Sequence, residues 1–388
     1  MRLKFLLPKI EVDHFLEPQV CPRAKCGGTY LRCRQEVAKP VRDTQYRVVT
    51  ARRYECLRCH HTFRVYPRGV ERAHTSQRVQ GLAVMFYVLG LSYGAVALAL
   101  EALGPYLSKT QVYEVVQKVA AKVPGLKRTQ VFEGVRTPAV GGDLTSVRCR
   151  GQWLGLGLTV DATGGWVLSV DEVDGLDAAT LQAWLAPIVE AAGAELLVTD
   201  DADALKTVAD ELGLAHQVCK AHVGRNTDAL VTELLPLVRS DADGSLTAHG
   251  LAADQAVTDL ERLHTLIHTR PVAAQAELAA LSQRYQVARP PQPGATFSLA
   301  YRLRLLFLDR WNLWPRLTRY RTWHGPAGET VDGTNNGCER AIGWWIKERY
   351  RAMRGYKRPL SAINLSRFMA WCGNYLGRGG ANLQTLFA

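Results

Sequence analysis

The order of secondary-structure signals between residues 136 and 226 limits the possible folds of this chain more than any other feature. Three consecutive strand patterns come first, in TPAVGGDLTSVRCRG, QWLGLGLTVDATGG and WVLSVDEV, and a Gly-rich turn joins two of them. An amphipathic helix follows in LDAATLQAWLAPIVEAAG, then a short buried strand in ELLVTDD, a helix in ADALKTVADELG, a strand in AHQVC and a helix in KAHVGRNTDALVTELLPLV. This β-β-β-α-β-α-β-α order predicts an antiparallel hairpin that leads into a layer of parallel strands.

That element order is the order of a ribonuclease-H-like α/β fold, and it makes two aspartates neighbours. Asp143 lies in the first predicted strand and Asp200 ends the fourth, so we expect both carboxylates to meet at one place on the sheet. Glu339, which begins a predicted helix much later in the chain, supplies a third carboxylate. Oxygen ligands of this kind hold two Mg²⁺ ions about 3.5–4 Å apart in enzymes that transfer phosphoryl groups. The three residues are therefore candidate ligands for catalytic metal ions.

Each carboxylate also has a purely structural interpretation. Asp143 follows two glycines and is compatible with the end of a strand or a bend in it. Asp200 and Asp201 precede a helix, where either one can serve as the N-cap, and the doublet leaves the register of the metal ligand open. We favour Asp200 because it directly follows the apolar strand LLVT. Glu339 lies three residues after Asn336, which is the spacing of a capping box. The catalytic interpretation depends on the ordered set of three.

Four cysteines near the amino terminus form two closely spaced pairs. Cys21 and Cys26 are separated by four residues, Cys56 and Cys59 by two, and the 29 residues between the pairs have the pattern of β-hairpins. Tetrahedral Zn²⁺ needs four soft ligands that converge, and two such pairs on facing hairpins supply them. This predicts a structural zinc ribbon whose metal provides much of the folding energy. The exact ligand set stays open at this point, because three further residues are candidates: Cys33, His60 and His61.

The charge of the chain is concentrated at its two ends. Residues 1–72 carry a net charge of +9 and residues 301–388 a net charge of +10, whereas residues 73–300 carry −7. Two basic ends indicate contact with a polyanion such as DNA, and the alternative is that they only promote solubility. The patterns divide the chain into five segments: a zinc-ribbon DNA-binding module (1–72), three Ser-capped helices with a helix-turn-helix (73–135), the first part of a catalytic core (136–226), an all-helical insertion (227–330) and the final core helices with Glu339 (331–388).

Signals for a membrane or a secretory route are not found. Even the most apolar stretch, GLAVMFYVLGLSYGAVALALEALG, is interrupted by glycines, and it fits paired helices better than a membrane span. The amino terminus lacks the long apolar region and cleavage site of a signal peptide. A cytoplasmic protein without a membrane partner is therefore expected, in which the nine cysteines are thiols or metal ligands.

Taken together, these motifs resemble a known family. Asp143 in VGGDLTSV, Asp200 in LLVTDD, then VCKAHVGRN and TNNGCERAIGWWIKERYRAMRGYK are similar to the DDE transposases of prokaryotic insertion sequences. Cys219 and His222, which follow the second aspartate as Cys-x-x-His, are similar to the signature of the Mutator-related branch. The resemblance covers about 136–226 and 330–360, and the amino-terminal modules and the helical stretch before Glu339 are usual companions in such enzymes.

The resemblance implies a DNA transposase with Asp143, Asp200 and Glu339 as catalytic residues that bind two Mg²⁺ or Mn²⁺ ions. Such an enzyme acts on double-stranded DNA as a homodimer or higher homo-oligomer in the prokaryotic cytoplasm, in association with the nucleoid. It cleaves a phosphodiester at each terminal inverted repeat and joins the freed 3′-OH to target DNA. For Cys219 and His222 we prefer a structural role that braces the catalytic strands. The basic residues after Glu339 are expected to bind DNA phosphates: Lys347, Arg349, Arg351, Arg354 and Lys357.

Two other functions stay open. A ribonuclease-H-like nuclease or resolvase would cut DNA without joining it. A domesticated transposase would be a DNA-binding regulator that uses the zinc ribbon and the helix-turn-helix but no longer cuts. The intact set of three carboxylates argues against the regulator, because a protein that only binds DNA has no need of them. The basic residues after Glu339 also fit a solvated charged face.

Overall fold

The computed structural model describes residues 4–123, 134–353, 355–375 and 380–387. The chain divides into two compact units. The first contains Met1–Leu126, Ser146–Leu154 and Ala341–Ala388, and the second contains Lys127–Thr145 and Gly155–Arg340. In the described parts of the chain no helix combines the length and the hydrophobicity that crossing a membrane requires.

The second unit is built on a mixed sheet whose elements follow one another as the sequence predicts. Within the described residues the sheet has five strands in the order β11-β10-β7-β8-β9, with β7, β10 and β11 parallel and β8 antiparallel to β9. This arrangement fits a ribonuclease-H-like core, so that the predicted element order is confirmed. The elements are β7 (Ala139–Cys149), β8 (Gln152–Asp161), β9 (Val167–Glu172), α4 (Ala178–Ala192), β10 (Leu196–Thr199), α5 (Asp203–Glu211), β11 (Ala215–Val218) and α6 (Lys220–Arg239).

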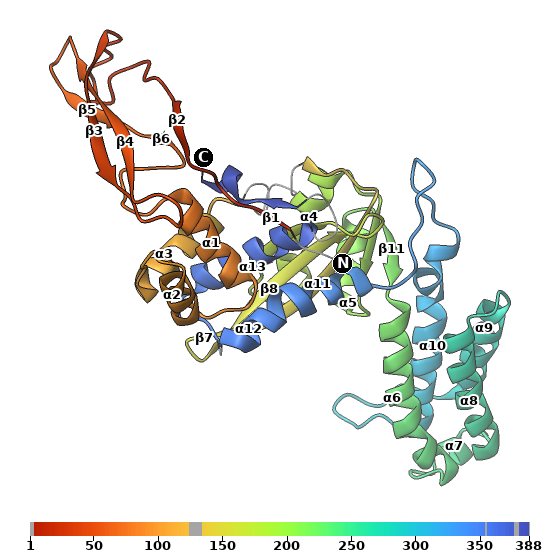
Figure 1. The fold of residues 1–388 in the computed structure, drawn as a ribbon. Coiled ribbons are helices and arrows are strands. Elements are labelled where there is room, and N and C mark those ends of the chain that lie inside the picture. The colour runs from red at the N-terminus through yellow and green to blue at the C-terminus, as the bar shows by residue number, and fades with distance from the viewer. Residues whose placement is uncertain (1–3, 124–133, 354, 376–379, 388) are drawn as a thin grey trace. The chain divides into compact units, whose positions relative to one another are not determined.

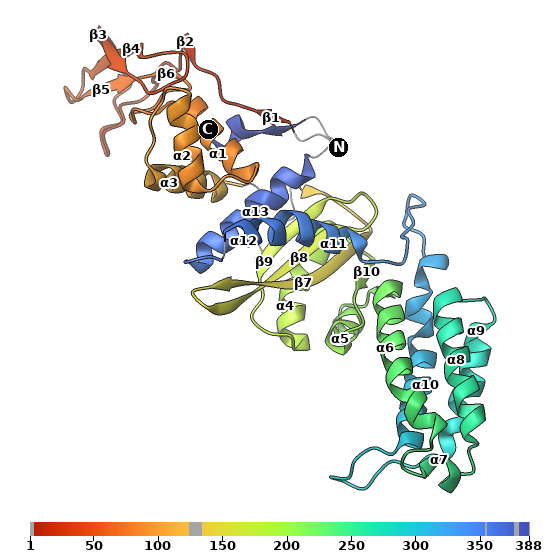
Figure 2. The same cartoon turned by 60° about the horizontal axis from the view of Figure 1, so that its bottom comes forward.

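Helices α4 and α5 cover one face of this sheet, where they bury an apolar core with β7, β9 and β10 (Figure 2). Helix α4 begins at the side-chain cap of Asp177 and ends at Gly193, which has the left-handed conformation common at helix ends. Trp184 of α4 is almost fully buried and lies against Gly157 of β8, where an added Cβ would come within 2.4 Å of the indole ring. Glycine at this strand position therefore lets the large ring pack flat on the sheet.

A helical bundle follows the sheet in the second unit. Helices α6, α8, α9 and α10 lie side by side in both views (Figures 1 and 2) and bury a continuous apolar core. The Pro-rich stretch 289–296 is a loop before the last of them, as predicted. That this bundle is an inserted domain stays a prediction. Its elements after α6 are α7 (Ser245–Ala248), α8 (Ala253–Thr269), α9 (Ala274–Arg284), η2 (Tyr285–Val287), α10 (Leu299–Leu317) and η3 (Arg319–Arg321).

The first unit begins with the predicted β module. Strands β3, β4 and β5 form an antiparallel sheet, β2 pairs with β6, and β1 pairs in parallel with β12 near the carboxyl terminus. The bounds are β1 (Phe5–Leu6), β2 (Glu11–Phe15), β3 (Leu31–Pro40), β4 (Val48–Cys56), β5 (Thr62–Val65), β6 (Pro67–Arg68) and β12 (Ala381–Asn382), the last followed by η5 (Leu383–Leu386).

Three helices come next, and each begins at a serine as predicted. The hydroxyls of Ser76, Ser92 and Ser108 accept hydrogen bonds from backbone N–H groups in the first turns of α1, α2 and α3, and Ser108 forms a full capping box with Gln111. The assignment of these helices to a DNA-binding helix-turn-helix stays a prediction. The bounds are α1 (Gln77–Val88), α2 (Tyr93–Ala102) and α3 (Lys109–Ala120).

The last helical segment starts close to Glu339 but is not one regular α-helix. A π-helical turn, η4 (Ile342–Lys347), separates α11 (Asn336–Ala341) from α12 (Glu348–Met353), and α13 (Pro359–Asn374) follows. Because a π-turn changes the angular spacing of side chains, residues on α12 do not continue the helical face of α11.

Candidate functional site

Asp143 and Asp200 lie beside each other on one face of the sheet. Strands β7 and β10 pair in parallel with Gly141 opposite Val198, so the same register two residues further on brings Asp143 level with Asp200. Side chains alternate between the faces of a strand. Leu197 packs in the core under α4 and α5, whereas Val198 packs on the opposite side. Both carboxylates therefore belong to the face opposite α4 and α5.

The Asp143 carboxyl group is electrostatically perturbed. Burial raises its pKa from the ordinary 3.8 to about 6, and the nearby charges of Asp200 and Glu339 act in the same direction. A single backbone hydrogen bond, from the Leu144 N–H at 2.8 Å, opposes the shift. The three predicted ligands are thus close enough to act on one another, and a cation at this place would relieve their repulsion.

The structure separates the roles of the two adjacent aspartates. Asp200 accepts a hydrogen bond from the Ala202 N–H at 3.2 Å, as expected for a residue just before a helix. The Asp201 carboxylate lies 2.9 Å from Lys206 Nζ and 4.0 Å from Arg310, and its side chain is only 9% exposed. Asp201 is therefore engaged in ion pairs with α5 and α10, which supports the choice of Asp200 as the ligand.

Glu339 lies in the first turn of α11, and its carboxylate faces α6. Its Oε1 atom is 3.5 Å from His222 Nε2 and 3.5 Å from a guanidinium nitrogen of Arg225. Within the described parts of the chain, neither this oxygen nor His222 Nδ1 has a hydrogen-bond partner, although both atoms are buried. The ligand atoms of Glu339, His222 and Cys219 all lie within 4.8 Å of one another, and the two aspartates are outside that group. The Glu339 charge nevertheless acts on the Asp143 carboxyl group and raises its pKa.

Asn335, which was not predicted from the sequence as a site residue, holds α11 against the sheet. Its carbonyl accepts the first helical hydrogen bond, from the Glu339 N–H at 3.1 Å, so that Asn335 and not Asn336 is the N-cap. Its side-chain amide donates to the Gly142 carbonyl at 2.9 Å. An added Cβ on Gly141 would come within 3.1 Å of this amide, so glycine is needed for the close approach. The capping-box interpretation of Asn336 and Glu339 is therefore wrong.

The Cys219 thiol also helps to hold α11 against the sheet. Cys219 is fully buried, and its sulfur accepts a hydrogen bond from the Asn335 N–H at 3.3 Å. Its own N–H donates to the Thr199 carbonyl at 2.7 Å, directly before Asp200. Cys219 thus contacts both the end of β10 and the start of α11, and His222 faces Glu339 from the next turn of α6. This geometry fits the bracing role that we prefer for the Cys-x-x-His pair.

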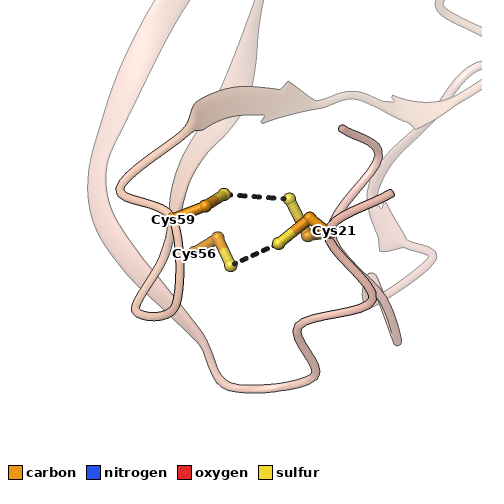
Figure 3. Close-up of side chains that lie close together, drawn as sticks. Cys21, Cys56 and Cys59 are labelled. Atoms are coloured by element: carbon orange, nitrogen blue, oxygen red, sulfur yellow. Dashed lines mark hydrogen bonds between the residues drawn. The ribbon is translucent and has the colours of Figure 1, made fainter. Parts of the chain in front are cut away.

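The four paired cysteines converge at the end of the β module (Figure 3). The sulfur atoms of Cys21 and Cys59 are 3.8 Å apart, and those of Cys26 and Cys56 are also 3.8 Å apart. A tetrahedral zinc ion with Zn–S bonds of about 2.3 Å places its sulfurs roughly 3.8 Å from one another. The cluster is therefore compatible with zinc. Three other candidates lie outside it: Cys33, His60 and His61.

The basic residues predicted to contact DNA differ in accessibility. The Arg349 side chain is buried, donates to the carbonyls of Gly90 and Leu91, and stacks on the ring of Tyr87. Lys347 donates to the Ser146 carbonyl at 2.6 Å, and burial lowers its pKa. Arg351 and Lys357 are exposed, and Arg354 lies outside the described residues. Arg349 therefore has a structural role here, and the exposed pair is the better candidate for phosphate contact.

Comparisons with known proteins give limited information. No protein-family model matches the chain, and no curated protein sequence matches it. Among solved structures, the chain is similar to the magnesium-bound catalytic core domain of HTLV-2 integrase, at 20% identity over 32% of this chain and 84% of that one, with a TM-score of 0.19. It is also similar to the Drosophila P element transposase strand transfer complex (10% identity, 78% and 92% covered, TM-score 0.37) and to the simian T-cell lymphotropic virus intasome (17%, 46% and 66%, TM-score 0.20). These TM-scores are too low to indicate a function, which is inferred below from the strand order and the site residues.

Proposed function

We propose that this protein is a DDE-type DNA transposase of the Mutator-related branch. In this proposal Asp143, Asp200 and Glu339 are the catalytic residues, and they act by metal-dependent cleavage of DNA followed by transfer of the 3′-OH to target DNA. The observation that carries the proposal is the position of Asp143 on β7 and of Asp200 directly after the adjacent parallel strand β10, with Glu339 close enough to help raise the Asp143 pKa.

The donor set fits Mg²⁺ or Mn²⁺. Carboxylate oxygens are the ligands that these hard cations prefer, and a buried carboxylate with a raised pKa gains most from a nearby positive charge. When bound, the ions would supply the charge that activates water or a 3′-OH and stabilises the leaving oxygen. Among the described residues the buried Glu339 Oε1 atom has no hydrogen-bond partner, although it lies 3.5 Å from His222 Nε2 and 3.5 Å from a guanidinium nitrogen of Arg225, so it is available as a further oxygen ligand.

Other residues of this chain hold the proposed catalytic side chains in position. Asn335 and Cys219 keep the start of α11 on the sheet beside Gly142 and the end of β10. His222 and Arg225 face the Glu339 carboxylate from α6, so they limit the directions in which it can turn. A site that is assembled from strands and two helix starts is rigid enough to align a phosphodiester with its attacking group.

The remaining parts of the proposal concern DNA binding and assembly. The β module, held by zinc at Cys21, Cys26, Cys56 and Cys59, and the helices after it would recognise the transposon ends. Residues 1–72, which include the β module, carry a net charge of +9, and this charge favours binding to the phosphate backbone of DNA. Exposed Arg351 and Lys357 would add sequence-independent contacts. Because transposition uses two DNA ends at once, the active form would be a homodimer or higher homo-oligomer.

The experiment is a coupled cleavage and strand-transfer assay. Labelled duplexes carry the DNA that flanks the gene, and the reactions contain Mg²⁺, Mn²⁺ or EDTA. We expect cut and joined products with either metal and none with EDTA. Asp143→Asn, Asp200→Asn and Glu339→Gln should each lower both steps by at least about a hundredfold, since each removes a metal-binding charge.

Asp174→Asn is the matched control, because Asp174 is an exposed carboxylate after β9 in the same unit. It should retain full activity. Full cleavage and joining by Glu339→Gln would refute the assignment of the third ligand. If the protein cuts DNA but does not join a supplied 3′-OH end to target DNA, its function is that of a nuclease or resolvase and not that of a transposase. DNA binding without either product would support a non-catalytic regulator.

A further inference from the structure

A second cluster of metal-ligating side chains lies in the helical bundle. Asp228 of α6 faces His264 and His268 of α8, and the three ligand atoms lie within 4.8 Å of one another. The Asp228 Oδ1 atom is 3.1 Å from His264 Nε2 and 2.6 Å from His268 Nε2. Both imidazoles thus direct the same nitrogen toward one carboxylate oxygen. Figures 1 and 2 show α6 and α8 in the same helical bundle.

The helices position these side chains without strain. His264 and His268 are four residues apart and therefore lie on the same face of α8, with ring centroids 4.5 Å apart. Gly224, one turn before Asp228 on α6, leaves room for the second imidazole, because an added Cβ there would come within 3.3 Å of His268 Cε1. Between 41% and 48% of each of the three side chains is exposed, so ions from solution can reach them.

We propose that Asp228, His264 and His268 form a binding site for Zn²⁺ or a similar transition-metal ion that links α6 to α8. Two imidazoles and a carboxylate are a usual ligand set for Zn²⁺, with water in the fourth position. Metal–ligand distances of about 2.0–2.1 Å in a tetrahedron place ligand atoms roughly 3.3 Å apart. The His264 nitrogen is already near this distance from Asp228 Oδ1, at 3.1 Å, and the His268 nitrogen, at 2.6 Å, has to move away from it. Small rotations of the three side chains are enough to admit the ion.

Such an ion would restrain the helix that begins at the candidate active site. The first turns of α6 carry His222 and Arg225, which face Glu339, and Asp228 follows one turn after Arg225. The site uses different side chains from the carboxylate site and from the cysteine cluster. Its presence does not depend on the proposed transposase activity.

The test is metal binding to the whole chain as purified, after its zinc content has been measured, in buffer with excess Mg²⁺. Zn²⁺ alone is titrated by calorimetry, and bound metal is counted by mass spectrometry. Asp228→Asn and His264→Gln should each remove one equivalent of bound Zn²⁺ or weaken its binding by more than the roughly ten- to hundredfold that loss of an outer-shell partner costs. His324→Gln, at an exposed histidine outside the cluster, should bind zinc as the unaltered protein does. Equal stoichiometry and affinity in all four proteins would overturn the proposal.

A measurement on the unaltered protein complements the variants. Diethyl pyrocarbonate modifies accessible imidazoles, and peptide mass spectrometry reports each site. Zn²⁺ should protect His264 and His268 but not His324. Equal modification of all three histidines with and without Zn²⁺ would show that the cluster is only an ion pair between Asp228 and the two imidazoles.

Discussion

Replacing Asp143 with asparagine should stabilise the metal-free protein at neutral pH. The folded state holds the Asp143 proton more tightly than the unfolded chain does, because burial raises the pKa of this carboxyl from 3.8 to about 6. The stability associated with the protonated form is present below pH 4 and is lost as the pH rises through about 6. A shift of about two pKa units corresponds to about 3 kcal/mol, and partial solvent exposure reduces this to about 2 kcal/mol.

The expected result is a pH-dependent difference between two proteins. In Mg²⁺-free buffer at pH 7.5, Asp143→Asn should unfold about 4–8 °C above the unaltered protein, since 1 kcal/mol shifts Tm by about 2–4 °C in a unit of this size. Near pH 4 the difference should become small, because the folded Asp143 side chain is then neutral and only about half of it is ionised in the unfolded chain. Calorimetric scans between these pH values measure it. Asp174→Asn is the control for removal of a carboxylate charge and should show no such pH dependence.

Adding Mg²⁺ provides a second comparison between Asp143→Asn and the unaltered protein. The ion should raise the Tm of the unaltered protein at pH 7.5 by mass action and should leave Asp143→Asn nearly unchanged. An Asp143→Asn variant that is equally or less stable at pH 7.5 would refute the reasoning. So would a stabilisation that is the same at pH 4 and pH 7.5, since the effect would then not arise from ionisation of this carboxyl group.

Three further predictions concern other parts of the molecule. Gly157→Ala should lower the free energy of unfolding by about 1–3 kcal/mol in urea titrations, because the new methyl group meets the Trp184 ring at a buried contact, and an unchanged midpoint would contradict this packing. Cys56→Ser should release zinc, measured by metal analysis, and unfold the β module seen by circular dichroism, whereas full zinc content would remove Cys56 from the ligand set. Arg349→Ala should lower Tm, because its buried guanidinium donates to the carbonyls of Gly90 and Leu91. Arg351→Ala should leave Tm unchanged and reduce the salt dependence of DNA binding by about one phosphate contact. The reverse pattern in thermal scans and salt titrations would contradict both assignments.

The sequence determined the local features of this protein. The alternation of apolar residues and the turn signals predicted each strand and helix between 136 and 226, and the serines before α1, α2 and α3 predicted their starts, because these signals depend on residues only a few positions apart. The paired cysteines likewise predicted the cluster at the end of the β module. The adjacency of Asp143 and Asp200 followed from the element order, since the first and fourth strands are neighbours in a ribonuclease-H-like sheet.

The tertiary structure alone decided how distant segments meet. The sequence does not show that Asn335 caps α11 while its amide binds Gly142, because the two residues are far apart in the chain and only the packed fold brings them together. Nor does it distinguish a solvent-exposed arginine from Arg349, whose guanidinium is buried against backbone carbonyls. The cluster of Asp228 with His264 and His268 has the same origin. Local patterns are encoded by neighbouring residues, whereas a site is made by long-range packing. The helix that carries Glu339 begins beside Gly142 because Asn335 bonds to Gly142 and Cys219 there.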